Sequence, residues 1–90
     1  MLIAVICDDK PGSIDLRRAN REAHLAYLDE TGVVAQAGPF LDAAGEMCGS
    51  LLILDLPDLA AARAWAARDP YALAGLFART EIRAWKRVIG

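Results

Sequence analysis

Histidine and cysteine are scarce in this sequence, which has one His and two Cys among 90 residues. A metal site usually needs three or four such ligands, and a single histidine without an acidic cluster does not supply them. Cys7 and Cys48 stand far apart and have no paired spacing, so we expect reduced thiols rather than a disulfide. The sequence therefore predicts no metal site, and we expect no cofactor.

The sequence also lacks a large net charge and a long apolar run. Its net charge is −2 and its pI is near 5.2, so no strong field attracts nucleic acid or an anionic membrane surface. No apolar stretch approaches the roughly 20 residues of a membrane span. A signal peptide would need basic residues before its apolar segment, and the apolar residues 1–7 have none. We expect a cytoplasmic protein that binds neither nucleic acid nor membranes.

The order of the expected elements is β-α-β-β-α-β, with one extra short helix. Ser13 is expected to cap the first helix and Gly32 to end it. This order matches the ferredoxin-like fold, an α+β domain with an antiparallel sheet and helices on one face. We expect one domain over residues 1–90. The expected strands are residues 2–7, 33–40, 50–56 and 77–88, the expected helices are 14–31, 59–68 and 69–75, and 42–49 is a hairpin loop.

Two of the expected strands are apolar on both faces. A sheet covered by helices on one side only should alternate apolar and polar residues. A second copy of the chain would cover the other face, so we expect a homodimer. The last strand has a mixed face that suits a rim or a polar pocket. In the first strand, one face carries Leu2, Ala4 and Ile6 and the opposite face carries Ile3, Val5 and Cys7. The mixed face of the last strand carries Phe77, Arg79, Glu81, Arg83 and Trp85.

The first helix carries a polar stripe on the side that should face the sheet. At about 100° per residue, His24 lies near the middle of the inward arc, together with Arg17, Asn20 and Arg21. Burying unpaired polar groups costs about 1–3 kcal/mol each, so the stripe predicts a lined cavity rather than a sealed core. In the structural alternative, a backbone carbonyl holds His24 while the two arginines reach to solvent.

Four other residues are candidates, each with a structural alternative. Asp69 precedes Pro70, a favoured helix start, so capping alone would explain it. A cap uses mainly one carboxylate oxygen, however, and the second is available to orient an imidazole. Ser50 is also explained as an ordinary residue at the start of a strand. Gly38 and Pro39 are explained as backbone features, a close approach and the end of a ladder.

These residues fall in four segments: Arg17-x3-Arg21-x2-His24-Leu25-Ala26-Tyr27-Leu28, Ala37-Gly38-Pro39-Phe40, Gly49-Ser50 and Asp69-Pro70-Tyr71-x3-Gly75-Leu76. This ordered set resembles the YciI-like (YCII-related) family and spans essentially the whole chain. The resemblance implies a ferredoxin-like subunit of a dimeric α+β barrel and a pocket with a histidine and an aspartate, here His24 and Asp69. A related member is a dehydrochlorinase for a chlorinated hydroxyquinol, whereas most members have no assigned reaction.

Two functions fit these residues. In the first, the chain is a small cofactor-free enzyme in which His24 is the general acid or base and Asp69 fixes its tautomer. Arg17 neutralises an enolate or phenolate, and Ser50 or a backbone N–H donates a hydrogen bond. The reaction class is then elimination or isomerisation of a small aromatic or oxo compound.

In the second function, the chain is a non-catalytic dimeric module that binds a small anion through His24 and Arg17. Gly38 and Pro39 are candidate ligand-binding residues in either case. An RNA-binding role is not expected, because residues 3–7 and 51–56 contain no aromatic side chain on which a base could stack. Turnover of a ligand separates the two functions, since the module would bind without turnover.

Overall fold

The computed structural model describes residues 1–90, and its elements follow the expected order. Most element ends lie within one residue of the expectation. The larger differences are that the first strand continues to Asp9, the third strand begins at Met47, the third helix stops at Leu73 and the last strand stops at Trp85. No helix is long and apolar enough to span a bilayer. The elements are β1 (Leu2–Asp9), α1 (Ile14–Thr31), β2 (Val34–Leu41), β3 (Met47–Asp55), α2 (Leu59–Ala67), α3 (Pro70–Leu73) and β4 (Phe77–Trp85).

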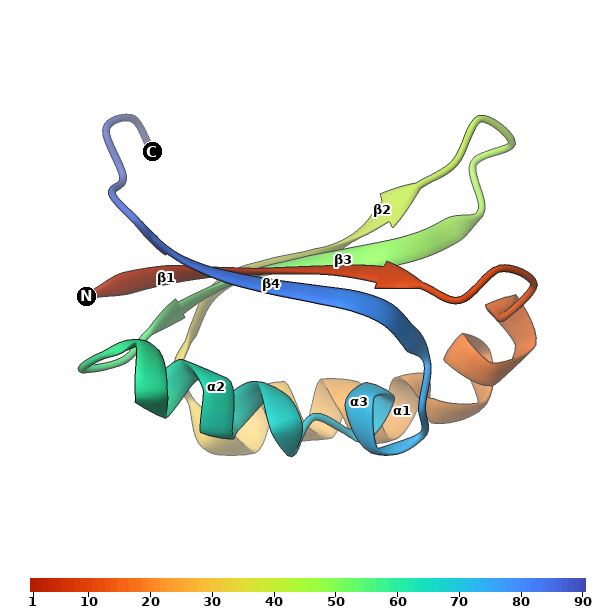
Figure 1. Ribbon diagram of the computed structural model, residues 1–90, viewed down its shortest axis with the longest axis horizontal. Coiled ribbons are helices and arrows are strands. Elements are labelled where there is room, and N and C mark those ends of the chain that lie inside the picture. Colours follow the sequence, from red (N-terminus) through yellow and green to blue (C-terminus); the bar gives the residue numbers. More distant parts are fainter.

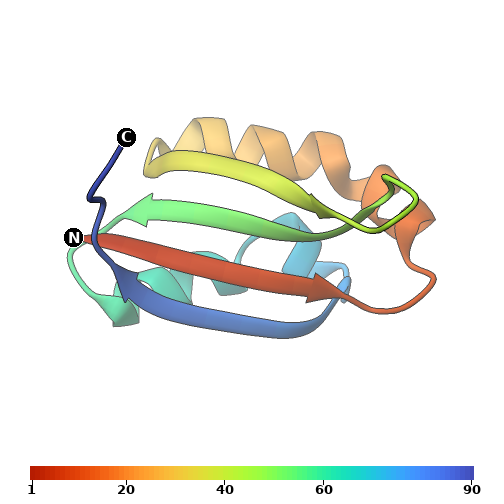
Figure 2. The same cartoon turned by 90° about the horizontal axis from the view of Figure 1, so that it is seen from above.

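The four strands form one antiparallel sheet in the order β2-β3-β1-β4. All the helices lie on one face of this sheet, and no element covers the other face (Figure 1). Seen from above, α1 runs alongside β2, and α2 and α3 lie near β1 and β4 (Figure 2). This is the ferredoxin-like α+β architecture expected from the sequence.

Local signals explain where the helices begin and end, with one correction. Gly32 ends α1 in the left-handed conformation, with φ of 65°, and its N–H donates to the carbonyl of Leu28. Asp58 caps α2, since its carboxylate accepts the N–H of Ala61 at 2.8 Å. The expected capping bond of Ser13 is wrong: Ser13 precedes α1, but its side chain makes no capping hydrogen bond.

The loop between β2 and β3 is shorter than expected, because β3 begins at Met47. One oxygen of Asp42 accepts the N–H groups of Ala44 and Glu46, at 2.9 and 3.0 Å. Gly45 has a φ of 80°, which a side chain would resist. These contacts close the turn within residues 42–46 and leave Ser50 well inside β3.

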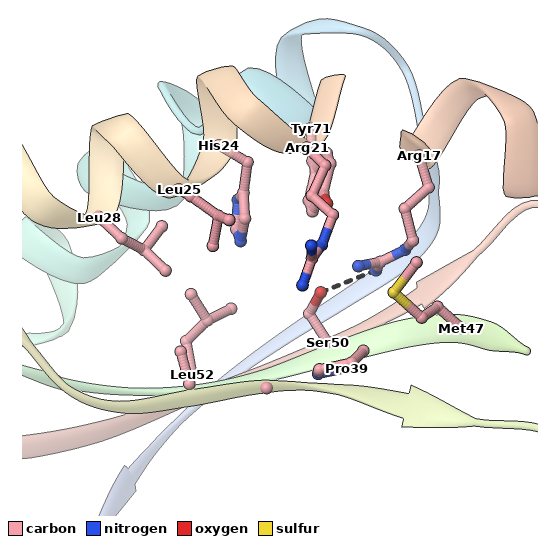
Figure 3. A pocket seen from close by; sticks show the side chains of 12 residues that line it. Arg17, Arg21, His24, Leu25, Leu28, Pro39, Met47, Ser50, Leu52 and Tyr71 are labelled. Carbon is pink, nitrogen blue, oxygen red and sulfur yellow. Dashed lines mark hydrogen bonds between the residues drawn. The ribbon is translucent and has the colours of Figure 1, made fainter. Parts of the chain in front are cut away.

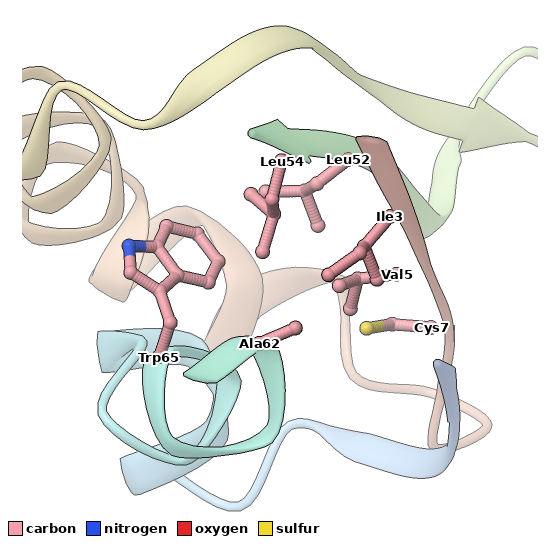
Figure 4. Close-up of a cluster of buried hydrophobic side chains, with 7 residues drawn as sticks. All are labelled: Ile3, Val5, Cys7, Leu52, Leu54, Ala62 and Trp65. Atoms are coloured by element: carbon pink, nitrogen blue, oxygen red, sulfur yellow. The ribbon is translucent and has the colours of Figure 1, made fainter. Parts of the chain in front are cut away.

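The hydrophobic core lies between the sheet and α2. Alternate residues of β1 and β3 point toward the helices, and Trp65 of α2 packs over them. Trp65 is held in place by its indole N–H, which donates to Thr31 at 3.0 Å. Each large apolar side chain that is fully buried contributes roughly 1.5–3 kcal/mol. The buried cluster is Ile3, Val5, Cys7, Leu52, Leu54, Ala62 and Trp65 (Figure 4).

A bulge in β4 changes the face of one residue. Asp8 is paired with Arg79 and Asp9 with Phe77, so Ala78 is an extra residue in the ladder. Phe77 therefore lies on the helix side, where it packs edge-on against Tyr71 with ring centroids 6.1 Å apart. The expectation that Phe77 shares a face with Arg79 is wrong for this reason.

Candidate functional site

A cavity of about 120 Å³ lies between α1 and the hairpin of β2 and β3 (Figure 3). Its polar lining comes from three different elements: Arg17, Arg21 and His24 on α1, Ser50 on β3 and Tyr71 on α3. Its apolar wall is formed by Leu25, Leu28, Met47, Leu52 and the segment Ala37-Gly38-Pro39. Three of the four residues of the inward polar stripe of α1 therefore line a cavity.

His24 and Asp69 are brought together although they are 45 residues apart in the sequence. The His24 Nδ1 lies 2.7 Å from the Asp69 Oδ1, and the residues are only 6% and 2% exposed. An ionised carboxylate can only accept, so in the neutral ring we assign the proton to Nδ1. The other ring nitrogen, Nε2, then carries the lone pair. His24 is thus held by a carboxylate and not by a backbone carbonyl.

Asp69 both caps α3 and contacts the imidazole. Its Oδ1 accepts the N–H of Tyr71 at 2.9 Å as well as the bond with His24. The expectation that the two roles use different oxygens is wrong, because both bonds meet at the same atom. Pro70 at the first helical position needs no hydrogen-bond partner there. The start of α3 therefore fixes the carboxylate next to the ring.

Tyr71 lies between His24 and Arg17 (Figure 3). Its ring stacks on the imidazole with centroids 3.9 Å apart and planes at 14°, and the Arg17 Cζ lies 4.6 Å from its centroid. Burial raises the pKa of the Tyr71 phenol, against the opposing charges of Arg17 and Arg21, so the hydroxyl stays protonated. Sequence reasoning did not make Tyr71 a candidate site residue, although it lies two residues after Asp69 in the same motif.

Arg17 is buried and tied to two partners. Its Nε and Nη2 donate to the two oxygens of Asp9, at 2.7 and 3.0 Å, and Nη2 also donates to the Ser50 Oγ at 2.8 Å. Burial alone would lower the pKa of Arg17, but the hydrogen bond and charge of Asp9 raise it above its ordinary value. Arg17 is 2% exposed, so it does not reach to solvent, whereas Arg21 is exposed.

Sequence reasoning missed Asp9, because the expected first strand ended at residue 7. If the alternation of β1 is continued by two residues, Asp9 falls on the same face as Ile3, Val5 and Cys7. The alternation could therefore have identified Asp9 as a residue that faces the helices. Asn20 was expected on the inward stripe, but its amide bonds to the carbonyl of Leu16 on its own helix, at 3.0 Å. Asn20 does not line the cavity.

Gly38 and Pro39 form part of the cavity wall from the edge strand β2, opposite Leu51 and Ser50. A Cβ on Gly38 would meet no atom within 4 Å, so the expected close approach is wrong. Pro39 does not end the ladder either, since β2 runs on to Leu41 and an edge strand tolerates the missing N–H. The close approach is instead at Gly49, where a Cβ would collide with the carbonyl oxygen of Cys7.

No group of three or more His, Cys, Asp or Glu side chains comes together in the structure. Cys7 lies under the site, buried among apolar side chains. Burial raises its pKa to about 11, although a hydrogen bond from Thr80 acts in the opposite direction. The Cys7 thiol is therefore protonated at neutral pH and is a poor nucleophile.

A ferredoxin-like fold with a polar cavity beneath its sheet defines the general class of this protein, and comparisons define the family. A family model described as the YCII-related domain matches residues 1–86. The chain is 35% identical to Protein YciI of Escherichia coli O6:H1, over 98% of this chain and 99% of that protein. It is 32% identical to an uncharacterized protein of Haemophilus influenzae over the same shares. The chain belongs to the YCII-related family, as the sequence resemblance indicated.

Solved structures are similar as well. The fold matches 5-chloro-2-hydroxyhydroquinone dehydrochlorinase from Burkholderia phenoliruptrix AC1100, in its complex with 2,5-dihydroxybenzoquinone, with a TM-score of 0.89 and 36% sequence identity. The match covers 96% of this chain and 94% of that one. A protein described as an antibiotic biosynthesis monooxygenase matches with a TM-score of 0.61 and 17% identity, which shows the fold alone.

Proposed function

We propose that this chain is a lyase-type enzyme that uses His24 as a general base and Asp69 to orient it. The observation that carries the proposal is the 2.7 Å contact between the two side chains at the wall of a cavity. A carboxylate on Nδ1 directs the lone pair of Nε2 outward and stabilises the imidazolium once a proton has been taken. The ring of Tyr71 stacks on the imidazole and limits its rotation.

The proposed reaction removes a proton from a small hydroxylated aromatic or oxo compound. The electron pair of the broken O–H bond forms a C=O bond, and His24 returns the proton to the ring carbon that carries the leaving group, which becomes tetrahedral. His24 then takes a second hydroxyl proton; the electron pair of that bond forms a second C=O bond, and the leaving group departs as an anion with its own bonding pair. The proton on Nε2 then passes to solvent. Dehydrochlorination has this form, and the relative from Burkholderia phenoliruptrix is named for it. Isomerisation is the same proton removal followed by return of the proton at another atom.

Arg17 and Ser50 would stabilise the negative charge that develops on a substrate oxygen. The Arg17 guanidinium is fixed by Asp9 and reaches Ser50, so two donors stand together at one end of the cavity. Donors that are already oriented need no reorganisation when the charge forms, which is the basis of oxyanion stabilisation. Gly38 and Pro39 would contribute the shape of the wall opposite α1.

The size of the cavity supports a compact substrate. Its volume is about 120 Å³, while pockets for drug-sized ligands have roughly 300–1,000 Å³ and a benzene ring occupies an engineered cavity of about 150 Å³. One six-membered ring with small substituents is therefore the expected scale.

We also propose that two copies of the chain pack through the bare faces of their sheets. That face keeps Phe40, Leu51 and Trp85 between 37% and 39% exposed, with Ile53 beside them. A depression over Gln36, Phe40, Leu51 and Ile53 offers a place for side chains of a second copy. Sheet-on-sheet packing would remove this apolar surface from water, at roughly 25 cal/mol per Å². Arg79, Glu81 and Arg83 would form the polar rim along β4.

Turnover of 5-chloro-2-hydroxyhydroquinone, measured as the release of chloride, tests the proposed catalysis. We expect His24→Gln to lower kcat by roughly 10²–10⁴-fold and to leave binding of 2,5-dihydroxybenzoquinone within a few-fold. Asp69→Asn should lower kcat as well, whereas Asp58→Asn, which alters the cap of α2, should not. A wild-type chain that binds the quinone and releases no chloride from any ring substrate would be a binding module, and the proposed catalysis would be wrong.

A further inference from the structure

The surface that a ligand meets in the cavity has no carboxylate. Its lining contains the guanidinium groups of Arg17 and Arg21, the imidazole of His24 and the hydroxyl groups of Ser50 and Tyr71. The two carboxylates of the site, Asp9 and Asp69, lie behind this lining and are bonded to Arg17 and His24. The cavity therefore presents donors and positive charge to its contents.

The arginines of α1 differ in how their charges are balanced. Arg17 is paired with Asp9 through two hydrogen bonds. Arg18, on the outer side of the helix, is paired with Glu46 at 3.1 Å. Arg21 forms no ion pair, although it lines the cavity. Arg21 is thus the positive charge of the lining that no carboxylate of the chain neutralises.

The position of Arg21 relates this charge to the rest of the site. Arg21 lies one turn before His24 on the same helix, and Leu25 follows it by four residues, so the three side chains are neighbours. Its side chain reaches from α1 toward the strand that carries Ser50 (Figure 3). A group bound by Arg21 would therefore lie about one helical turn from the imidazole, beside the apolar wall of Leu25 and Leu28.

We propose that Arg21 binds an oxygen that is already ionised when the ligand arrives, and that the ligands of this cavity are small flat anions such as ionised phenols, enols or carboxylates. The inference rests on the proposed function only in placing the ligand in the same cavity. Arg17, whose charge is balanced by Asp9, serves as a positioned donor for charge that develops later. Arg21 acts on the charge that the ligand brings. If a contact is equally strong in the bound complex and in the transition state, its loss raises KM and leaves kcat unchanged.

Calorimetric titration with two ring compounds tests this assignment. The first is 2,5-dihydroxybenzoquinone, whose hydroxyl groups are vinylogous acids and ionise below neutral pH. The second is hydroquinone, a ring of similar size whose phenols stay neutral at pH 7, since a phenol has a pKa of about 10. The variants are Arg21→Gln, Arg21→Lys, which keeps the charge, and Arg18→Gln, a matched control on the same helix. Arg21 is exposed, so its replacement leaves the core intact.

We expect Arg21→Gln to weaken binding of dihydroxybenzoquinone about tenfold and to leave hydroquinone unchanged, because a charged hydrogen bond partly open to water contributes at the lower end of its range. Arg21→Lys should retain most of the affinity, and Arg18→Gln all of it. Added salt should weaken binding to the wild type and not to Arg21→Gln. Equal losses for both ring compounds, no loss for either, or a wild type that does not prefer the anion would each overturn the assignment.

The same titrations separate this inference from the proposed catalysis. If the anion binds through Arg21 and chloride is never released from any ring substrate, the proposed catalysis fails and the role of Arg21 stands. If His24→Gln abolishes turnover while Arg21→Gln changes neither KM nor the affinity for the quinone, the role of Arg21 fails alone.

Discussion

The ion pair between Arg17 and Asp9 is expected to be the most stability-sensitive contact of the site, and Asp9→Asn tests it. The side chains of Arg17 and Asp9 are 3% and 5% exposed, so water cannot replace a lost partner. Removing one member of a buried pair costs about 3–5 kcal/mol, because the remaining charge stays buried without compensation. Asparagine keeps one acceptor oxygen for the two donors of Arg17, which places the expected loss at about 3 kcal/mol.

Urea unfolding at fixed protein concentration measures this loss, since the concentration matters if two copies associate. For a domain of this size, 3 kcal/mol corresponds to a lowering of Tm by roughly 12–24 °C. Glu46→Gln is the matched control, because it removes the carboxylate from an ion pair that is 58% and 51% exposed and should cost no more than about 1 kcal/mol. Adding Arg17→Met to Asp9→Asn removes the unpaired charge and should restore part of the stability. If Asp9→Asn costs as little as the control, the reasoning from burial is wrong.

Two further predictions concern the bare sheet face and the buried thiol. Light scattering at micromolar concentration should give about twice the chain mass of 9.7 kDa for the wild type. Leu51→Lys, on the bare face, should give the mass of a single chain. A wild-type monomer would contradict the proposed pairing. Alkylation at pH 8 should modify Cys48 first, because burial raises the pKa of Cys7 to about 11 and shields its sulfur. Equal rates for the two thiols in the folded protein would refute this.

The order of elements could be predicted from the sequence because turn residues separate the segments clearly. Gly32, Pro57 and Pro70 mark helix ends and starts, and apolar alternation marks the strands. The true ends of the strands could not be predicted in the same way. β1 continues through the polar Asp8 and Asp9 because β4 pairs with them across a bulge, and this pairing is a tertiary contact. The face of Phe77 depended on the same bulge.

The candidate site divides into a part that local patterns reveal and a part that they do not. The spacing of Arg17, Arg21 and His24 on α1 predicted a lined cavity, because polar residues on an inward face need partners. Asp69 lies 45 residues from His24, and no periodicity connects them. Capping left an oxygen of Asp69 available for an imidazole, but it was the family resemblance that placed the two residues in one pocket. Tyr71 could not be recognised as a site residue from local patterns, since its position between two side chains of α1 follows from the packing of α3.

The buried polar groups of this small protein form a continuous set, which has a consequence for how substitutions combine. Of the 16 buried residues, Arg17, His24, Ser50 and Asp69 are polar or charged, and every buried side-chain nitrogen and oxygen has a hydrogen-bond partner. Asp9, Arg17 and Ser50 share one chain of hydrogen bonds. The ring of Tyr71 lies between Arg17 and His24, and His24 is bonded to Asp69. We therefore expect a substitution at one end of this set to alter the orientation of groups at the other. When two residues of this set are substituted together, the losses in the free energy of unfolding should not add. The losses from substituting Asp9 and the distant Asp58 together should add.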